Sequence, residues 1–234
     1  MSKEIFVDAL VARPDGIPFF SLLKSRLING GRITQVQAVL DENNLTPGNL
    51  AEVVRLAFGV EIELEDILVG DTRISERDRS FAQKFGFKVL PLAYASLNGD
   101  QVEAWIQSTL VLEEHPLART GNENAVMITT ESSLSPGSLS RNHVLPYGEA
   151  TSAYYLRMTV RDHPGVLAMI TQKFAGSNIN IRGVIQPKAE EGSKVTDIAF
   201  ILSPCKTHVL QSTLVSIGAS ENVRETNAVF RVLL

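Results

Sequence analysis

Four consecutive residues, Asp162-His-Pro-Gly165, have the composition of a small-anion site. They follow an alternating stretch, Tyr155–Val160, and precede apolar residues at helical spacing. The first N–H groups of a helix have no partner inside it, so they attract an anion such as a carboxylate. Asp162 could accept a hydrogen bond from a ligand's ammonium group, and Asn180 could bond either group. In the alternative interpretation, Asp162 only caps the helix, which is a common use of Asp, and Asn180 only faces solvent.

The elements that must position these residues follow one another as βαββαβ. Leu156, Met158 and Val160 share one strand face, and Ile179, Ile181 and Ile185 are expected to share another. Glycine is expected to end both helices, at Gly176 and Gly218. Strands are predicted at 155–160, 179–186, 195–202 and 228–234, and helices at 166–174 and 207–217. This order predicts a sheet covered by helices on one face.

Two stretches of this unit, Arg161–Leu167 and Ser177–Ile181, resemble the motifs of the ACT domain, a regulatory amino-acid-binding module. The resemblance covers 153–234 and implies a ferredoxin-like fold. It also implies that two copies pair side by side with an amino-acid effector, such as threonine, between them. The effector-binding residues implied by the resemblance are Asp162, His163, Gly165, Val166, Asn178 and Asn180. The family often has Asn where this chain has Asp162.

Composition is typical of a soluble globular protein of one large or two ordinary domains. The chain has 234 residues, 44% hydrophobic and 21% charged, with a net charge of −4. The sequence has no run of basic residues that would indicate binding to nucleic acid or to an anionic membrane. No apolar stretch reaches the length of a transmembrane helix. The N-terminus lacks a signal peptide, so a cytoplasmic location is expected. The single cysteine, Cys205, is expected to be structural, and the four histidines show no metal-ligand spacing.

The sequence before the βαββαβ unit also predicts both strands and helices. A capping box, Ser75-Glu-Arg-Asp78, should open one helix, and Pro91 argues that its strand is an edge or carries a bulge. A domain boundary is expected between Leu145 and Thr151, giving domains at 1–148 and 151–234. Strands are predicted at 6–11, 33–40, 88–95, 101–112 and 124–129, helices from Pro18 to about Leu27 and at 50–58 and 75–85, and a loop at 132–142.

Several collinear stretches over 6–130 resemble the substrate-binding, catalytic domain of homoserine dehydrogenase, and an ACT domain follows in many members of that family. The resemblance implies an α+β catalytic-domain remnant before the ACT domain, in an oxidoreductase family of aspartate-family amino-acid biosynthesis that uses NAD(P). The stretches are Gly16–Pro18, Arg32–Thr34, Arg55–Gly59, Ile74–Asp78 with Ala82 and Gly86, Lys88–Leu90, His115–Ala118 and Asn124–Val126.

The departures from that family concern its chemistry. The 234 residues hold no GxGxxG after a strand to cradle dinucleotide phosphates. Only about a dozen residues separate Leu40 from the next helix, too few at helical rise for the family's substrate-binding segment. Aligned back from Gly59, the family's catalytic lysine falls on Asn49 and its acid on Leu45, and an amide cannot shuttle a proton at neutral pH. We therefore predict no catalytic residue and no cofactor for this chain.

Other polar groups have ordinary interpretations. The acidic residues Glu61–Asp66 are expected to be a solvated surface, Glu113–His115 lacks zinc spacing, and Trp105 is expected to pack in a core or interface. Three hypotheses remain. The chain is a regulatory module that binds an amino acid and self-associates, an active NAD(P)-dependent homoserine dehydrogenase subunit, or a purely structural dimerisation module.

Overall fold

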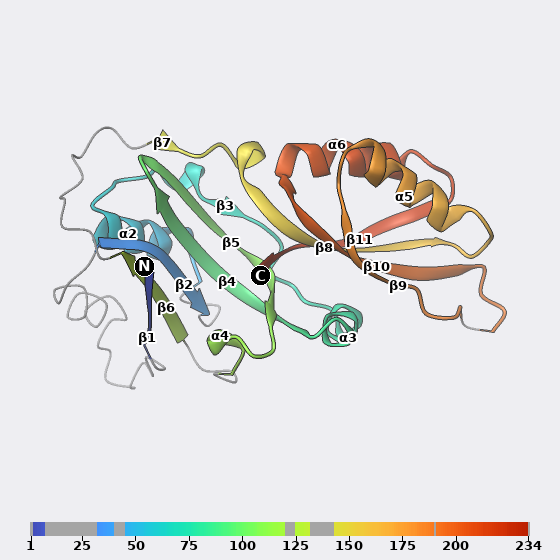
Figure 1. Cartoon of the computed structure of the whole chain (residues 1–234), viewed down its shortest axis with the longest axis horizontal. Coiled ribbons are helices and arrows are strands. Elements are labelled where there is room, and N and C mark those ends of the chain that lie inside the picture. Colours follow the sequence, from blue (N-terminus) through green and yellow to red (C-terminus); the bar gives the residue numbers. More distant parts are fainter. Residues whose placement is uncertain are drawn as a thin grey trace. The chain divides into compact units, whose positions relative to one another are not determined.

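The computed structural model describes residues 2–7, 32–39, 45–119, 125–131, 143–189 and 191–233, which form a mixed α+β structure (Figure 1). Its contacts define two compact units. The first comprises Met1–Arg73, Leu90–Ser108 and Glu113–Pro146, and the second comprises Ile74–Val89, Thr109–Leu112 and Tyr147–Leu234. The predicted helix from Pro18, residues 8–11, 40, 124 and 234 of the predicted strands, and the predicted loop at 132–142 lie outside the described residues.

The first unit is a mixed sheet with a helix packed on it. The strands run in the order β1 (Ser2–Val7), β6 (Ala125–Glu131), β2 (Arg32–Val39), β4 (Phe87–Asn98) and β5 (Gln101–Leu112). Two short strands, β3 (Leu68–Val69) and β7 (His143–Val144), pair in parallel with β5. A 3-10 turn, η1 (Leu64–Asp66), and a short helix, α4 (Pro116–Arg119), complete the regular elements described here.

Helix α2 (Pro47–Phe58) covers the sheet of the first unit. Thr46 caps its start, since the Thr46 hydroxyl accepts a hydrogen bond from the Asn49 backbone N–H. Gly59 ends it in the left-handed conformation, with φ of 70°. Its apolar stripe of Leu50, Val53, Val54 and Phe58 is buried. The stripe packs in the same core as Val36, Ala95, Val102 and Val126 of the strands.

Of the two alternatives predicted from Pro91, an edge strand or a bulge, the edge strand is wrong. Strand β4 lies between β2 and β5, so it is an interior strand of the sheet. The ladder from β4 to β2 covers only Ala93–Ser96. Pro91 therefore lies beyond the end of that ladder, where its missing N–H removes no hydrogen bond to β2.

The second unit contains the predicted βαββαβ unit. Its elements are β8 (Thr151–Arg161), α5 (Val166–Gly176), β9 (Ile181–Ile185), β10 (Val195–Lys206), α6 (Thr207–Gly218) and β11 (Val223–Leu233). The strands are ordered β11-β8-β10-β9, and Figure 1 shows α5 and α6 together on one face of the sheet. Leu156, Met158 and Val160 are buried beneath these helices, so the predicted apolar face of β8 is confirmed.

The helices of the unit lie on one face, as predicted, and the opposite face of the sheet is covered as well. Helix α3 (Glu76–Lys84) packs there with the start of β4 and the end of β5. Successive strand residues point to opposite faces of a sheet. Tyr155, Ile201 and Phe230 point to the face opposite α5 and α6, where they share a core with Phe81 of α3. A helix from the homoserine-dehydrogenase-like part of the sequence therefore completes the fold of the C-terminal sheet.

Strand β9 does not keep the predicted common face for its isoleucines. Ile179 and Ile181 pack with the α5 and α6 core, whereas Ile185 packs with the α3 core. The register of β9 against β10 shifts between Ile201 and Leu202. Because strand side chains alternate with a period of two, such a bulge moves the residues after it to the other face.

The end of α5 is set by Asn178 rather than by Gly176. Gly176 is the last helical residue, and Asn178 has φ of 55°. The Asn178 N–H donates to the Ala175 carbonyl and the Ile179 N–H to the Phe174 carbonyl, while Ile179 packs in the same core as Phe174. These bonds form a Schellman motif. Asn occupies the left-handed position because its short polar side chain tolerates that conformation better than most residues do.

A buried ion pair attaches α3 to the sheet. Arg157 of β8 donates from Nε to Asp78 Oδ1 at 2.7 Å and from Nη2 to Asp78 Oδ2 at 3.1 Å. Tyr155 donates its hydroxyl to the same Oδ1 at 3.0 Å. Asp78 also makes the predicted capping box with Ser75, whose hydroxyl accepts from the Asp78 N–H and bonds the Asp78 carboxylate. The Asp78 carboxylate therefore joins the start of α3 to Tyr155 and Arg157, which are two positions apart on β8.

Asp197 of β10 extends this network along the same face. Its Oδ2 accepts from Arg77 Nη1 at 2.9 Å and lies 3.5 Å from Arg157 Nη1, and its Oδ1 accepts from the Thr159 hydroxyl at 2.6 Å. Asp78, Arg157 and Asp197 are all buried. The network thus pairs each buried charge with an opposite charge and with additional hydrogen-bond partners.

The pKa of Asp78 is set by two opposing influences, its burial and its hydrogen-bonded, charged partners. Burial by itself would raise it, but the hydrogen bonds from Arg157 and Ser75 and the charge of Arg157 outweigh burial, so the pKa lies below its usual value. Burial and the neighbouring Asp78 charge raise the pKa of Tyr155, so its hydroxyl remains a donor. Asp78 is therefore ionised and paired at neutral pH.

We expect Asp78→Asn to lower the free energy of unfolding by about 3 kcal/mol at pH 7, because it leaves the Arg157 charge without its main partner. A carboxyl group whose pKa is lower in the folded than in the unfolded protein stabilises the fold at pH values above its unfolded pKa, which is near 3.9 for Asp. This stabilisation is lost as the pH falls through the pKa of the folded state. The difference between wild type and variant should therefore be constant from pH 8 to pH 5 and narrow below about pH 4. Urea unfolding across this range measures it.

Asp71→Asn is the matched control for that experiment. Asp71 pairs with Arg73 at 3.0 Å, but both side chains are largely exposed, so its loss should change stability by less than about 1 kcal/mol. A pH-independent difference for Asp78→Asn, or one no larger than that of the control, would contradict the assignment.

Asn178→Ala should cost about 1 kcal/mol, because alanine is strained in the left-handed conformation, whereas Asn178→Gly should be nearly neutral. Thermal unfolding without any ligand measures both. Asn180→Ala serves as the control and should change stability by less than about 0.5 kcal/mol, since Asn180 is exposed. Equal stability of the alanine and glycine variants at position 178 would show that the cap is not strained.

Candidate functional site

The six residues implied as effector ligands fall into two groups at opposite ends of α5. Asp162, His163 and Gly165 precede the helix and Val166 begins it, whereas Asn178 and Asn180 follow its end. The helix has 11 residues, which corresponds to about 16 Å at 1.5 Å per residue. A single amino acid is much shorter than this, so one molecule cannot contact both groups within one copy of the chain.

The start of α5 has the features of an anion site. Gly165 is the N-cap residue with φ of 93°, a conformation that side chains other than glycine rarely adopt. No side chain caps the helix, so the alternative in which Asp162 is the capping residue is wrong. Asp162 and Gly165 are exposed, while the Val166 side chain is buried in the core. The Val166 N–H donates to the His163 carbonyl at 3.5 Å, so the N–H groups that could bind an anion are those that follow it in the first turn, near the exposed Asp162.

Asp162 and His163 are held in place by neighbouring loops. The Asp162 N–H donates to the Lys194 carbonyl at 2.9 Å. The His163 ring lies with Nδ1 at 2.9 Å from the Pro164 carbonyl oxygen and Nε2 at 3.0 Å from Asn222 Oδ1. Both ring nitrogens are engaged within the chain, so His163 orders the loop, whereas the Asp162 side chain is left exposed.

At the other end of α5, the two asparagines differ in what holds them. Asn178 is required by the backbone geometry of the helix end, as described above. The Asn180 carbonyl accepts from the Ser203 N–H at 2.8 Å, and its residue is exposed. Asn180 thus presents a side-chain amide just before β9.

Strand β9 lies at the end of the sheet order, with β10 as its neighbour. Val184 of this strand is 44% exposed. Among the described residues, no strand pairs with the other side of β9. An open strand edge presents unpaired N–H and C=O groups to which a second strand can add.

The positions aligned with the catalytic residues of the resembling family lie in the first unit. Leu45 packs against the core of that unit. Asn49 is in the first turn of α2, with its backbone N–H bound to Thr46. Neither side chain ionises near neutral pH, so neither position can transfer a proton in the manner of a lysine or an acid.

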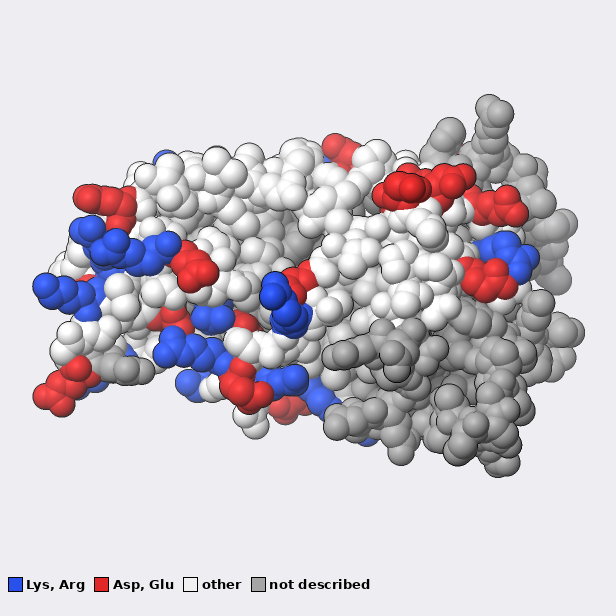
Figure 2. All heavy atoms as spheres, turned by 180° about the vertical axis from the view of Figure 1, so that it is seen from behind, with Lys and Arg blue, Asp and Glu red and all other residues white. Residues whose placement is uncertain are grey.

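The acidic residues of the stretch 61–66 lie at the surface of the first unit. Glu61, Glu63, Glu65 and Asp66 are all exposed, and Figure 2 shows acidic side chains gathered at the surface of one face. No three His, Cys, Asp or Glu side chains in the described segments are placed to hold a metal ion. None of the described helices is both long and apolar enough to cross a membrane.

Trp105 and Cys205 have structural roles. Trp105 is buried and stacks on Tyr94 with 4.7 Å between ring centroids, which confirms its predicted packing role. Burial raises the pKa of the Cys205 thiol, so the reactive thiolate is disfavoured. Cys205 packs at the margin of the α5 and α6 core.

Sequence reasoning missed the buried network of Asp78, Arg157 and Asp197. Its signal was present, because Arg157 and Asp197 interrupt predicted strands that are otherwise rich in apolar residues. However, Asp78 is 79 residues from Arg157, and Arg77 is 120 residues from Asp197. No local pattern connects positions so far apart.

Comparison with known proteins agrees with both resemblances. Residues 49–140 match the profile of the homoserine dehydrogenase family, and residues 156–202 match that of the AHAS small subunit-like ACT domain. The homoserine dehydrogenase of Pseudomonas aeruginosa is 23% identical, over 74% of this chain and 50% of that protein. The enzyme of Bacillus subtilis is 22% identical, over 78% and 51%. The chain spans about half the length of these curated relatives.

Solved structures show the same fold. A homoserine dehydrogenase from Thiobacillus denitrificans superimposes with a TM-score of 0.75 at 18% identity, over 92% of this chain and 67% of that one. The Staphylococcus aureus enzyme at pH 7.5 gives 0.56 at 14% identity, over 87% and 65%. With the two profile matches, these likenesses show that the chain has a homoserine-dehydrogenase-like region at 49–140 and an ACT-like region at 156–202.

Proposed function

We propose that this homoserine-dehydrogenase-like protein serves as a regulatory module in amino-acid biosynthesis, whose ACT-like domain binds a small amino acid between two copies of the chain. The observation that carries the proposal is the open, uncapped start of α5 beside the exposed Asp162. Threonine, an end product of the branch in which homoserine dehydrogenase acts, is the first candidate for the effector.

Each group of the ligand has a complementary partner in this arrangement. The ligand carboxylate accepts hydrogen bonds from the N–H groups at the start of α5, where the helix dipole also favours negative charge. Its ammonium group donates to Asp162. Asn180 of a second copy supplies an amide, because Asn180 of the same copy lies about one helix length away.

The open edge of β9 supports self-association. A second copy that adds its own β9 would extend the sheet through backbone hydrogen bonds and would satisfy groups that are otherwise exposed. Asn180 immediately precedes this strand, so such pairing would carry Asn180 toward the partner copy. The same contact would thus create both the dimer and the effector site.

We further propose that these 234 residues by themselves do not transfer hydride. This rests on the amide and the aliphatic side chain at Asn49 and Leu45, where a proton-transferring lysine and an acid are expected, and on the lack of a GxGxxG motif in the sequence. Regulation by the ACT-like domain is then the function that the described site supports.

We expect L-threonine to bind the purified chain saturably in calorimetry, and Asp162→Ala and Asn180→Ala each to weaken binding at least about tenfold, because each removes a hydrogen-bond partner of a charged group. When the two variants are mixed and allowed to exchange, about a quarter of the wild-type sites should return. In a mixed dimer, one site combines the intact Asp162 of one copy with the intact Asn180 of the other.

Asp100→Ala is the control for this series, since Asp100 is an exposed acid in the turn between β4 and β5 of the first unit. It should leave the threonine titration unchanged. Binding that persists in both site variants, or a stable dimer that responds to no amino acid, would reject the effector site and leave dimerisation as the function. Two inactive variants that do not complement each other would reject a site shared between copies.

Titration of the same chain with NADPH, followed by nucleotide fluorescence, should show no saturable binding, and homoserine should not reduce NAD(P)⁺ in its presence. The Pseudomonas aeruginosa homoserine dehydrogenase, assayed in parallel, is the positive control. Saturable NADPH binding together with homoserine-dependent reduction would establish the enzyme hypothesis instead.

A further inference from the structure

A cavity of about 330 Å³ opens on the α3 face of the ACT-like sheet. Its walls come from α3, from β8 and β10, and from the turn that joins β9 to β10. A volume of this size falls within the range of small-molecule sites. The cavity lies on the face of the sheet opposite α5 and α6, so it is distinct from the proposed effector site at the ends of α5.

Asp197 forms a buried, charged part of the cavity wall, and its carboxylate is already satisfied. Its Oδ1 accepts from Thr159, and its Oδ2 accepts from Arg77 and Arg157. Asp197 therefore offers little to an incoming cation, but it fixes the Arg77 guanidinium at the cavity wall. The Arg77 side chain is 66% exposed, so a ligand entering from solvent meets it directly.

A second cation lines the same cavity from a different element. Lys188 lies in the turn before β10 and is exposed, and within the described segments it takes part in no ion pair. Arg77 and Lys188 are cationic and Asp197 is anionic among the charged lining residues. The balance of charge at the cavity therefore favours an anion.

The rest of the lining is partly apolar. Phe81 of α3, Pro187 of the turn and Val195 of β10 line the cavity beside the two cations. This combination matches a ligand that carries a negative head and a short hydrocarbon body. The negative head would meet the cations, and the hydrocarbon body would meet the apolar side chains.

We propose that the cavity is a binding site for a small organic anion, a carboxylate with a short apolar body. Arg77 and Lys188 hold the carboxylate, and Phe81, Pro187 and Val195 contact the body. The ligand contacts α3 and the β9–β10 turn together, so its binding fastens α3 to the ACT-like sheet and stabilises the folded unit. This site goes beyond the proposed function and does not depend on it.

The test titrates the full ¹⁵N-labelled chain with 4-methylpentanoate and, separately, with its uncharged analogue 4-methylpentanamide. The expected result is saturable movement of the Ala189 and Thr196 amide signals, which belong to the cavity lining, with the carboxylate and much less with the amide. Lys188→Gln should weaken carboxylate binding about tenfold, the cost of one charge-assisted hydrogen bond.

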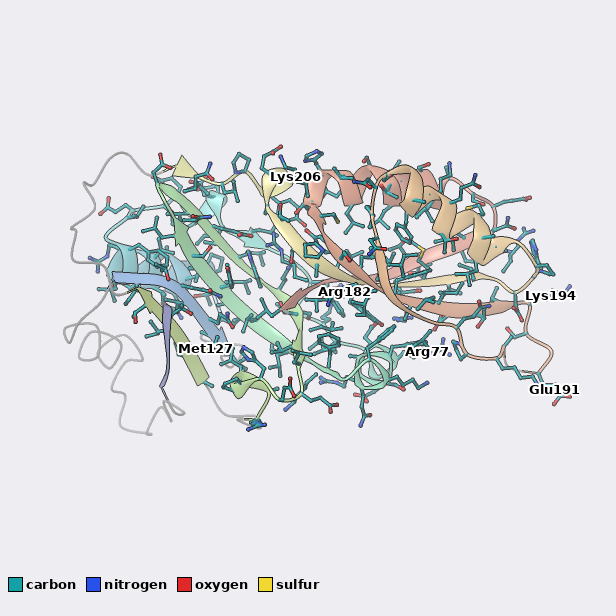
Figure 3. All side chains as sticks on the ribbon, viewed as in Figure 1. Arg77, Met127, Arg182, Glu191, Lys194 and Lys206 are labelled. Carbon is teal, nitrogen blue, oxygen red and sulfur yellow. The ribbon has the colours of Figure 1, made fainter. Side chains whose placement is uncertain are left out.

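Lys194→Gln is the matched control, because Lys194 is an exposed lysine of the same turn that does not line the cavity. Figure 3 labels Arg77 on α3 and Lys194 toward the far end of the turn. The control variant should bind 4-methylpentanoate as wild type does. Asp162→Ala should also leave this binding unchanged, so failure here and failure of the threonine site are separate results.

Three outcomes would overturn the proposal. The first is an absence of saturable signal movement with wild type, and the second is equal binding of the carboxylate and the amide. The third is an equal loss of affinity in Lys188→Gln and Lys194→Gln, which would show a general effect of the turn's charge rather than a site. Backbone spectra of all variants check that each one is folded.

Discussion

The second unit depends on one buried interaction, the pairing of Asp78 with Arg157. Two buried opposite charges on separate elements are costly to separate, since either one alone would face a protein interior without a partner. The bidentate contact also fixes the orientation of the two side chains, because a planar guanidinium pairs with a carboxylate through two parallel hydrogen bonds. Tyr155, Ser75 and Asp197 satisfy the remaining polar groups. The position of α3 on the sheet follows from this arrangement.

This interaction explains why the ACT-like sheet is covered on both faces. Helices α5 and α6 bury one face, and α3 buries the other with Phe81, Phe230 and Tyr155. Helix α3 lies within the stretch that matches homoserine dehydrogenase. The two sequence similarities therefore meet in one packed unit, in which a helix of the stretch that matches homoserine dehydrogenase covers one face of the ACT-like sheet.

In the described part of the second unit, the surfaces that we consider for binding are the ends of α5, the edge of β9 and the cavity beside α3. These surfaces differ in chemistry. The start of α5 offers backbone N–H groups beside Asp162, while the cavity offers the side-chain cations Arg77 and Lys188. An effector at the first would act between copies, and an anion at the second would act on α3 within one copy. The effector would favour the paired copies, and the anion would favour the folded second unit.

Local patterns in the sequence were sufficient for most elements of the second unit. The alternation of Leu156, Met158 and Val160, the helical stripe through Ile170 and Phe174, and the capping box at Ser75 each report on residues a few positions apart. The profile and structure comparisons bear out the two family resemblances, because short motifs in a fixed order survive when overall identity is low.

Tertiary structure decided what depends on distant residues. The end of α5, by contrast, is fixed by the left-handed conformation of Asn178 and the hydrogen bonds around it, which the expected stop at Gly176 did not reveal. The closure of the second sheet face by α3, the pairing of Asp78 with Arg157, and the cavity beside them join segments far apart in the chain. Sequence periodicity shows that a face is apolar or polar, but only packing determines which segment covers it, since many segments could satisfy the same pattern.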